Sequence, residues 1–114
     1  MAIANLDIQN TAQSILTVPV DNTYVVTTMF IVNTAEPDAN DDTAGLTYLT
    51  AHIVSNGSVG DIDNTNMVIN KIPLAAGETF VWDTEKIVLG SSDSVVLLST
   101  APNNLSATVS FVDI

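Results

Sequence analysis

The strongest constraint on the fold is a two-residue alternation of apolar and polar side chains along most of the sequence. Near the C-terminus Leu105, Ala107 and Val109 alternate with small polar residues, and the segment from Leu49 to Ile53 alternates in the same way. Successive side chains of a β-strand point to opposite faces, so this period predicts strands with one buried face. No window has the 3.6-residue period of an amphipathic helix.

Turn-forming residues separate the apolar segments at intervals of roughly a dozen residues. They occur at Pro19–Asn22, Ala75–Glu78, Gly90–Asp93 and Pro102–Asn104. This spacing predicts an all-β fold, an antiparallel β-sandwich that is Ig-like or jelly-roll-like, with about eight short strands. The expected strands cover residues 3–9, 13–18, 23–33, 46–55, 66–73, 79–89 (with a candidate break at Asp83–Thr84), 94–99 and 105–112.

The segment TYVVTTMFIV is apolar on both sides of its expected strand. Simple alternation puts Tyr24, Val26, Phe30 and Val32 on one face, and Val25, Met29 and Ile31 on the other. A strand that is apolar on both faces is covered on both, inside one molecule or under a neighbour. The second half of the chain is expected to form a meander of hairpins.

The length of 114 residues favours one β-sandwich domain over residues 1–114. Residues 1–12 have no obvious turn partner and are a candidate extended N-terminal arm that reaches a neighbouring molecule. The first residues lack the basic start of a secretory signal, and no apolar run has the length of a membrane span. We therefore expect a protein made in a cytoplasm. The absence of cysteine excludes a disulfide scaffold and a thiol nucleophile.

Charge limits the classes of partner. Only 13% of the residues are charged, against an ordinary share of about 25%. The formal net charge is -11, with Lys71 and Lys86 as the only basic residues besides one histidine. Binding to nucleic acid phosphates requires many Lys and Arg residues, so we expect no nucleic acid partner. The same deficit disfavours an anionic membrane surface.

Two long loops, at residues 33–45 and 55–66, carry the acidic clusters 36–42 and 61–63. Each cluster begins with the one-three-five spacing of a calcium-binding loop, but each lacks the Gly at position six and the Glu at position twelve. We therefore predict solvated acidic loops, with no metal site and no cofactor, although a looser calcium site remains an alternative. The residues with this spacing are Asp38, Asn40 and Asp42, and Asp61, Asp63 and Thr65.

Catalytic groups are scarce. His52 is the only histidine, lies on the polar face of its expected strand, and is predicted to be a surface or interface residue. No G-x-S-x-G segment marks a nucleophilic serine. Asp83 and Glu85 lie beside Trp82 and could form a glycosidase pair, but Trp82 alternates with Phe80, so core packing accounts for both rings. We predict no catalytic residues and no enzymatic activity, and a small hydrolase using His52 is the weakest alternative.

Two segments resemble small β-sandwich virion structural proteins of tailed bacteriophages. SILTVPVDNTYVVTTMFIVNTAE (Ser14–Glu36) is similar to the front of such proteins, with a strand ending in Val-Pro, a short turn and a long apolar strand that closes with Asn. INKIPLAAGETFVWDTEKIVLGSSDSVVLLSTAPNNLSATVSFVDI (Ile69–Ile114) is similar to the back, with an Ala-Gly-Glu-Thr turn and a final strand ending in Ser-Phe-Val-Asp. The resemblance covers most of the chain except the two long loops.

The resemblance implies a virion structural protein. Within that class we expect a capsid decoration or cement protein on the capsid exterior, because an acidic protein is repelled by packaged DNA. Its expected partners are the major capsid protein or other virion proteins and further copies of itself, in a homo-oligomer. The alternative is a tail, neck or fibre module that binds another virion protein, or a host glycan through Tyr48, Trp82 and the acidic loops.

Overall fold

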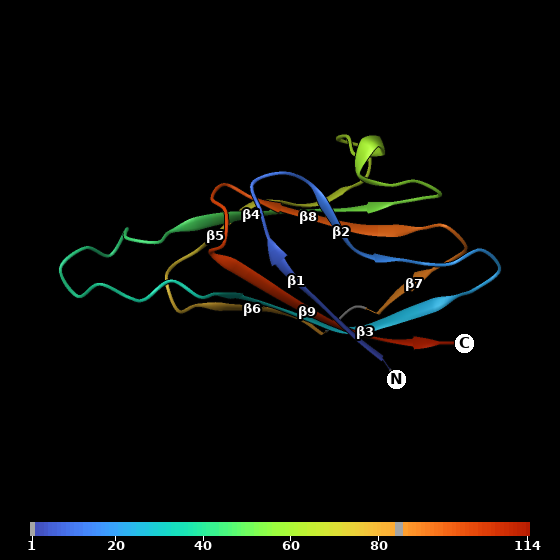
Figure 1. The fold of residues 1–114 in the computed structure, drawn as a ribbon, viewed down its shortest axis with the longest axis horizontal. Coiled ribbons are helices and arrows are strands. Elements are labelled where there is room, and N and C mark those ends of the chain that lie inside the picture. Colours follow the sequence, from blue (N-terminus) through green and yellow to red (C-terminus); the bar gives the residue numbers. More distant parts are fainter. Residues whose placement is uncertain (1, 84–85) are drawn as a thin grey trace.

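The computed structural model describes residues 2–83 and 86–114 and shows two antiparallel sheets packed face to face (Figure 1). The prediction of an all-β antiparallel sandwich is confirmed. The segment expected as one strand at 79–89 forms two strands, and the expected break includes Thr84, which lies outside the described residues. The strands are β1 (Ala2–Ile8), β2 (Gln13–Thr17), β3 (Tyr24–Asn33), β4 (Thr47–Val54), β5 (Met67–Leu74), β6 (Thr79–Trp82), β7 (Ile87–Leu89), β8 (Ser94–Ser99) and β9 (Leu105–Asp113).

Sheet A has the strand order β1-β9-β3-β6, with β7 also paired to β3, and sheet B has the order β2-β8-β4-β5. If β6 and β7 are counted as one interrupted strand, the first strand pairs with the last, the second with the second-last, and so on inward to β4 and β5. This rolled-up hairpin is the topology of a jelly roll. The structure therefore distinguishes between the two sandwich types that the sequence allowed.

The expected meander in the second half is wrong. β4 and β5 form a hairpin, but the chain then crosses to sheet A for β6 and β7, returns to sheet B for β8, and crosses again for β9. The turn residues at Ala75–Glu78 and Gly90–Asp93 mark where a strand ends. They do not specify which sheet receives the next strand, because that depends on which apolar face remains to be covered.

The core lies between the sheets and follows the predicted alternation. Leu105, Ala107 and Val109 of β9 are fully buried against Leu49 and Ala51 of β4 and their neighbours. One strand departs from simple alternation: a bulge in β3 between Val26 and Thr28 shifts its register with β9. The extra residue puts Val26 on the core face together with Met29 and Ile31, so the predicted grouping of Val26 with Phe30 is wrong.

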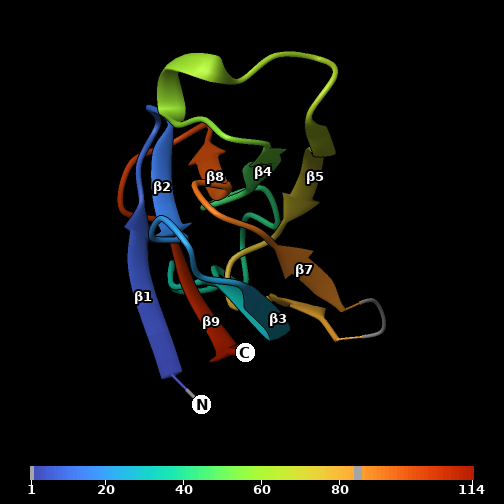
Figure 2. The ribbon, with the colours of Figure 1, turned by 90° about the vertical axis from the view of Figure 1, so that its right-hand side faces the viewer.

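Residues 2–8 of the candidate N-terminal arm form β1, which pairs with β9 along its whole length. β1 is the outermost strand on one side of the molecule (Figure 2). The segment is thus an edge strand of sheet A in this molecule. The described residues include one short 3-10 turn, η1 (Val59–Asp61), and none of them forms a helix of the length and apolarity that a bilayer crossing requires.

Candidate functional site

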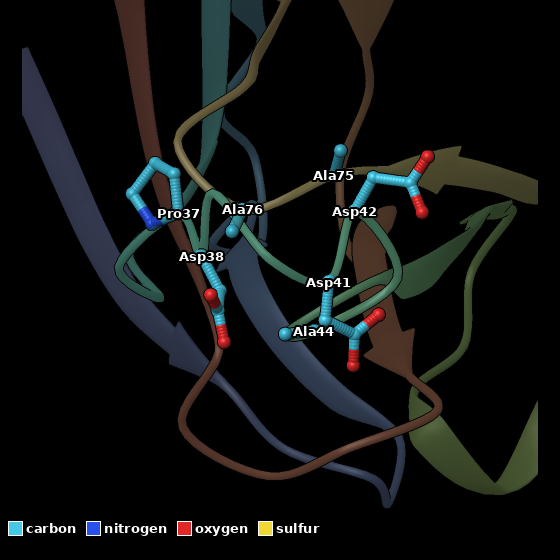
Figure 3. Close-up of a pocket in the computed structure, with 7 residues that line it drawn as sticks. All are labelled: Pro37, Asp38, Asp41, Asp42, Ala44, Ala75 and Ala76. Atoms are coloured by element: carbon cyan, nitrogen blue, oxygen red, sulfur yellow. The ribbon is translucent and has the colours of Figure 1, made fainter.

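The acidic connection between β3 and β4 forms a shallow pocket at one end of the sandwich. The pocket has a volume of about 230 Å³ and lies between this connection and the turn that joins β5 to β6 (Figure 3). Gly77, in a left-handed conformation with φ of 82°, brings that turn close to the ring of Pro37. The lining residues are Pro37, Asp38, Asp41, Asp42, Ala44, Ala75 and Ala76.

Asn33, at the end of β3, holds the base of this pocket together. Its side chain is 1% exposed and donates to Gly45 O at 2.7 Å and to Leu74 O at 2.8 Å, while its Oδ1 accepts from Ala35 N at 3.0 Å. Its backbone bonds to Glu78 O and to Gly77 N. Asn33 therefore ties both ends of the acidic connection to the β5–β6 turn, with every polar atom of its amide satisfied.

The carboxylates of the acidic connection serve its own turns. Asp38 Oδ1 accepts from Asn40 N at 2.9 Å, and Asp41 Oδ1 accepts from the hydroxyl and the backbone N–H of Thr43. The Thr43 hydroxyl, followed by its N–H, lowers the pKa of Asp41. The carboxylates of Asp38, Asp41 and Asp42 point in different directions (Figure 3). Within residues 2–83 and 86–114, no three His, Cys, Asp or Glu side chains are placed to hold one metal ion.

The second long loop, residues 55–66, folds over the outer face of sheet B, where η1 lies above the sheet in Figure 1. Ser94 Oγ of β8 donates to Gly57 O at 2.7 Å. His52 Nδ1 lies 2.7 Å from Asn66 Oδ1. Because this Oδ1 also accepts from Asp63 N, and Asn66 Nδ2 donates to Asp61 O, His52 Nδ1 is the donor.

His52 is consequently buried, with 4% of its surface exposed. The prediction of a surface or interface histidine is wrong, because alternation places His52 outside the core but cannot show that the loop following β4 folds back over that face. Val54 and Val96, on the same face, are 2% and 0% exposed. The hydrogen bond between His52 and Asn66 fastens the loop to sheet B.

Asp61 and Asp63 also act within their loop. Asp61 Oδ2 accepts from Ser58 N at 2.9 Å, and Asp63 Oδ1 accepts from the hydroxyl and the N–H of Thr65. The Thr65 hydroxyl, followed by its N–H, lowers the pKa of Asp63. Both carboxylates therefore cap local turns, as Asp side chains commonly do.

The aromatic residues of the glycan alternative lie on different surfaces. Trp82 packs edge-on against Phe80, with ring centroids 6.5 Å apart, and both rings pack against the core from sheet A. This confirms core packing as the reason for their alternation. Tyr48 lies on the outer face of sheet B and is 38% exposed. Tyr48 and Trp82 thus do not form one sugar-binding surface, and Glu85 lies outside the described residues.

The outer face of sheet A is an open surface. None of the segments that the structure describes crosses beneath this sheet in Figure 1, in contrast to the loop over sheet B. Phe30 of β3 lies opposite Val81 of the edge strand β6, and these side chains are 46% and 43% exposed. Their neighbours are neutral. Ladder register and alternation assign to this face Ile3, Asn5, Asp7, Val25, Phe30, Val32, Thr79, Val81, Val88, Ser106, Thr108, Ser110 and Val112.

Of the residues that the ladder register places on this face, one is charged: Asp7, at its β1 side. Among the described residues, Asp7 and Asp113 are the acidic residues that lie in strands, and the others lie in loops and turns. A chain with a net charge of -11 thus presents a partly apolar sheet face whose one charge, Asp7, lies at its β1 side, with acidic loops at the ends of the sheet. The apolar pattern on both sides of the strand at residues 24–33 was the sequence signal for this surface.

Comparisons with known proteins give a likeness of fold. No protein-family model matches the sequence, and the comparison with curated proteins gives no match. Among solved structures, the chain is similar to a chain in the acidic stable capsid structure of Helicobacter pylori bacteriophage KHP30, with a TM-score of 0.54 and 13% identity. The match covers 99% of this chain and 90% of that chain. The similarity of fold therefore extends over nearly the whole chain.

Proposed function

We propose that this chain is a non-enzymatic structural protein of a tailed-phage virion that decorates the outer surface of the capsid and stabilises it. The observation that carries the proposal is the whole-chain similarity of fold to a chain in a phage capsid structure. The jelly-roll topology supports it, because viral capsid domains are among the proteins that use this fold.

Surface chemistry supports a position outside the shell. The net charge of -11 gives repulsion from packaged DNA, which disfavours the capsid interior. The outer face of sheet A offers neutral and apolar side chains that a protein surface can cover. Each large apolar side chain buried there contributes roughly 1.5–3 kcal/mol. We propose that this face contacts the major capsid protein, whose complementary surface is apolar at its centre and basic at its rim.

The first experiment measures how many copies of the chain a purified particle contains and where they lie. Quantitative mass spectrometry should give a copy number comparable to that of the shell protein, and cryo-electron microscopy should show the chain on the outside of the capsid. A few copies per particle, located at the tail, neck or fibres, would contradict decoration and favour the alternative module.

The second experiment tests the contact face with a matched pair of variants. Val81 and Val68 are 43% and 44% exposed, but Val81 lies on the outer face of sheet A and Val68 lies on β5 of sheet B. Val81→Asp should weaken binding of the purified chain to capsids that lack it by roughly tenfold or more, because the charge is desolvated at the contact. Val68→Asp should bind like the natural chain. Equal affinities for the two variants would exclude this face as the contact.

A further inference from the structure

The four sheet edges differ in how well they are protected against pairing with another strand. An open edge presents unpaired backbone N–H and C=O groups. β5 contains Pro73 and the left-handed Lys71, with φ of 54°, and β2 has a register irregularity between Ser14 and Leu16. The opposite edge of sheet A is divided between β6 and β7. By contrast, β1 pairs with β9 residue for residue from Ala2 to Ile8, with no bulge and no proline.

The hydrogen-bonding pattern of β9 with its neighbours β3 and β1 shows which backbone N–H and C=O groups of β1 are unpaired. Thr34 N donates to Asn104 O at 2.8 Å, just beyond the β3–β9 register. In an antiparallel ladder, pairs that exchange backbone hydrogen bonds alternate with pairs that do not. Asn104, Ser106, Thr108 and Ser110 therefore direct their backbone N–H and C=O groups toward β3. The intervening residues direct theirs toward Ala2, Ala4, Leu6 and Ile8 of β1.

The backbone groups of Ile3, Asn5 and Asp7 therefore point away from sheet A. One of them, Asp7 O, accepts a hydrogen bond from the exposed Gln9 side chain at 3.2 Å. The three side chains also share the outer face of the sheet, where Asn5 Oδ1 accepts from Thr108 Oγ1 at 2.8 Å. Ile3 is 65% exposed. β1 thus offers three regularly spaced residues for pairing with a further strand.

We propose that β1 pairs antiparallel with β1 of a second copy of this chain, around a two-fold axis at Asn5. In this register Asn5 faces Asn5 of the second copy, and Ile3 faces Asp7. Each of these facing pairs exchanges two backbone hydrogen bonds, because all three residues point outward. On the inner face, Ala4 meets Leu6 of the second copy, which extends the apolar layer across the junction.

Charge and symmetry favour a second copy in this register. Asp7 is the only charged residue of β1, and the two-fold at Asn5 keeps the two Asp7 carboxylates on opposite sides of the axis. A two-fold at Asp7 would place them directly opposite each other, which is destabilising. A two-fold at Ile3 would leave Asp7 without a partner in the strand. The register at Asn5 therefore uses all the free groups of the edge without like-charge contact.

The two-fold axis is perpendicular to the joined sheets, so both outer faces of sheet A lie on the same side of the dimer. The dimer therefore presents the outer face of sheet A twice on one side, and the strand pairing leaves both copies of this face exposed. Because the dimer carries two such faces, it binds with higher avidity than one chain to a surface on which the binding site is repeated. The dimer itself depends only on the edge of the isolated chain, so its failure in solution leaves the proposed virion role standing.

Single cysteine variants test the register directly, because the chain has no cysteine of its own. Across the proposed two-fold the Cα atoms of residue 5 lie about 5.5 Å apart, which a disulfide can bridge. Those of residue 7 are offset by four residues, or about 13 Å, and cannot be bridged. Asn5→Cys should oxidise to a covalent dimer in a glutathione redox buffer, and Asp7→Cys should remain a single chain on non-reducing gels.

Cross-linking of both variants to the same extent, or of Asp7→Cys alone, would overturn the register. A natural chain that is monomeric by light scattering at about 100 μM would overturn the dimer, since a specific edge contact forms below that concentration.

A charge pair provides a second test that does not need oxidation. Ile3→Lys places a cation opposite Asp7 of the second copy, and Ile3→Asp places a second anion there. The dimer dissociation constant, measured by sedimentation, should be roughly tenfold or more lower for Ile3→Lys than for Ile3→Asp, since each contact occurs twice. Circular dichroism controls for folding. Equal constants for the two folded variants would contradict the facing of Ile3 and Asp7.

Discussion

Individual polar side chains in this protein act mainly as fasteners between loops and strands. Asn33 satisfies two carbonyls and one N–H at the base of the acidic connection, and Asp93 accepts from both Asn56 N and Gly90 N. Asp41 and Asp63 accept hydrogen bonds from threonines two residues later. Five residues that looked like metal ligands or catalytic groups in the sequence therefore have structural partners: Asp38, Asp41, His52, Asp61 and Asp63.

Asn33→Asp should be among the most destabilising single changes in the chain. The new carboxylate would be buried against Gly45 O and Leu74 O, which can accept but not donate hydrogen bonds. We expect the free energy of unfolding, measured by urea denaturation, to fall by about 3–5 kcal/mol. Asn40→Asp, which adds the same charge at an exposed position, should change it by less than about 0.5 kcal/mol. Similar values for both variants would show that the Asn33 contacts contribute little.

Acid should weaken the loop that contains Asp63. The pKa of Asp63 in the folded protein is below its ordinary value of 3.8. The carboxylate therefore contributes stability that is present above pH 3.8 and is lost as the pH falls through the lowered folded pKa. Thr65→Val removes the main cause of the shift, so the pKa of Asp63 should rise toward 3.8 in an NMR titration of the carboxyl carbon. The pKa of Asp41, which depends on Thr43, should stay where it is. An unchanged pKa of Asp63 in the Thr65→Val variant would mean that the Thr65 hydroxyl does not cause the lowered pKa.

At the scale of elements, the two sheets have different outer faces. The loop at residues 55–66 covers the part of the outer face of sheet B that contains His52, Val54 and Val96, whereas the outer face of sheet A is open. The same alternating pattern thus gives a buried polar face in one sheet and an exposed neutral face in the other. The difference depends on a loop that is distant in sequence from β8.

Asn66→Ala should release this loop. The change removes the acceptor of His52 Nδ1 and of Asp63 N, as well as the donor to Asp61 O. We expect amide hydrogen exchange to become faster across residues 56–66, and the free energy of unfolding to fall by about 1–3 kcal/mol because buried polar groups lose their partners.

Asn64→Ala is the matched control, because Asn64 is exposed in the same loop. Amide hydrogen exchange in the Asn64→Ala variant should be the same as in the natural chain. If Asn66→Ala also exchanges normally, the loop is held by its other contacts, such as Ser94 Oγ to Gly57 O.

At the scale of the whole molecule, most strand pairs join segments that are far apart in the sequence. Among the strands that the structure describes, β4 and β5 are the only consecutive pair that forms a hairpin, while β1 pairs with β9 across nearly the full chain. Loop-closure entropy makes such folds slow to form. The topology therefore predicts refolding in the range of milliseconds to seconds or slower.

A circular permutant tests this prediction. Ala2 lies opposite Phe111, so a short Gly/Ser linker between the two ends converts β9 and β1 into a hairpin. With the chain opened between Asn40 and Asp41 in the exposed acidic connection, we expect the same sandwich and a refolding rate raised by roughly threefold or more in stopped-flow fluorescence of Trp82. An unchanged refolding rate with the same stability would contradict the prediction and show that the β1–β9 pair forms after the rate-limiting step.

The sequence by itself determined the positions of the strands and their buried faces, because side-chain alternation and turn chemistry are local properties of the chain. It also determined the acidity and the scarcity of catalytic groups. Only the tertiary structure decided the jelly-roll order, the bulge that moves Val26 to the core, the burial of His52 and the open, neutral face around Phe30. Each of these depends on which distant segment covers which face, and that is set by the packing of the whole molecule rather than by any local pattern.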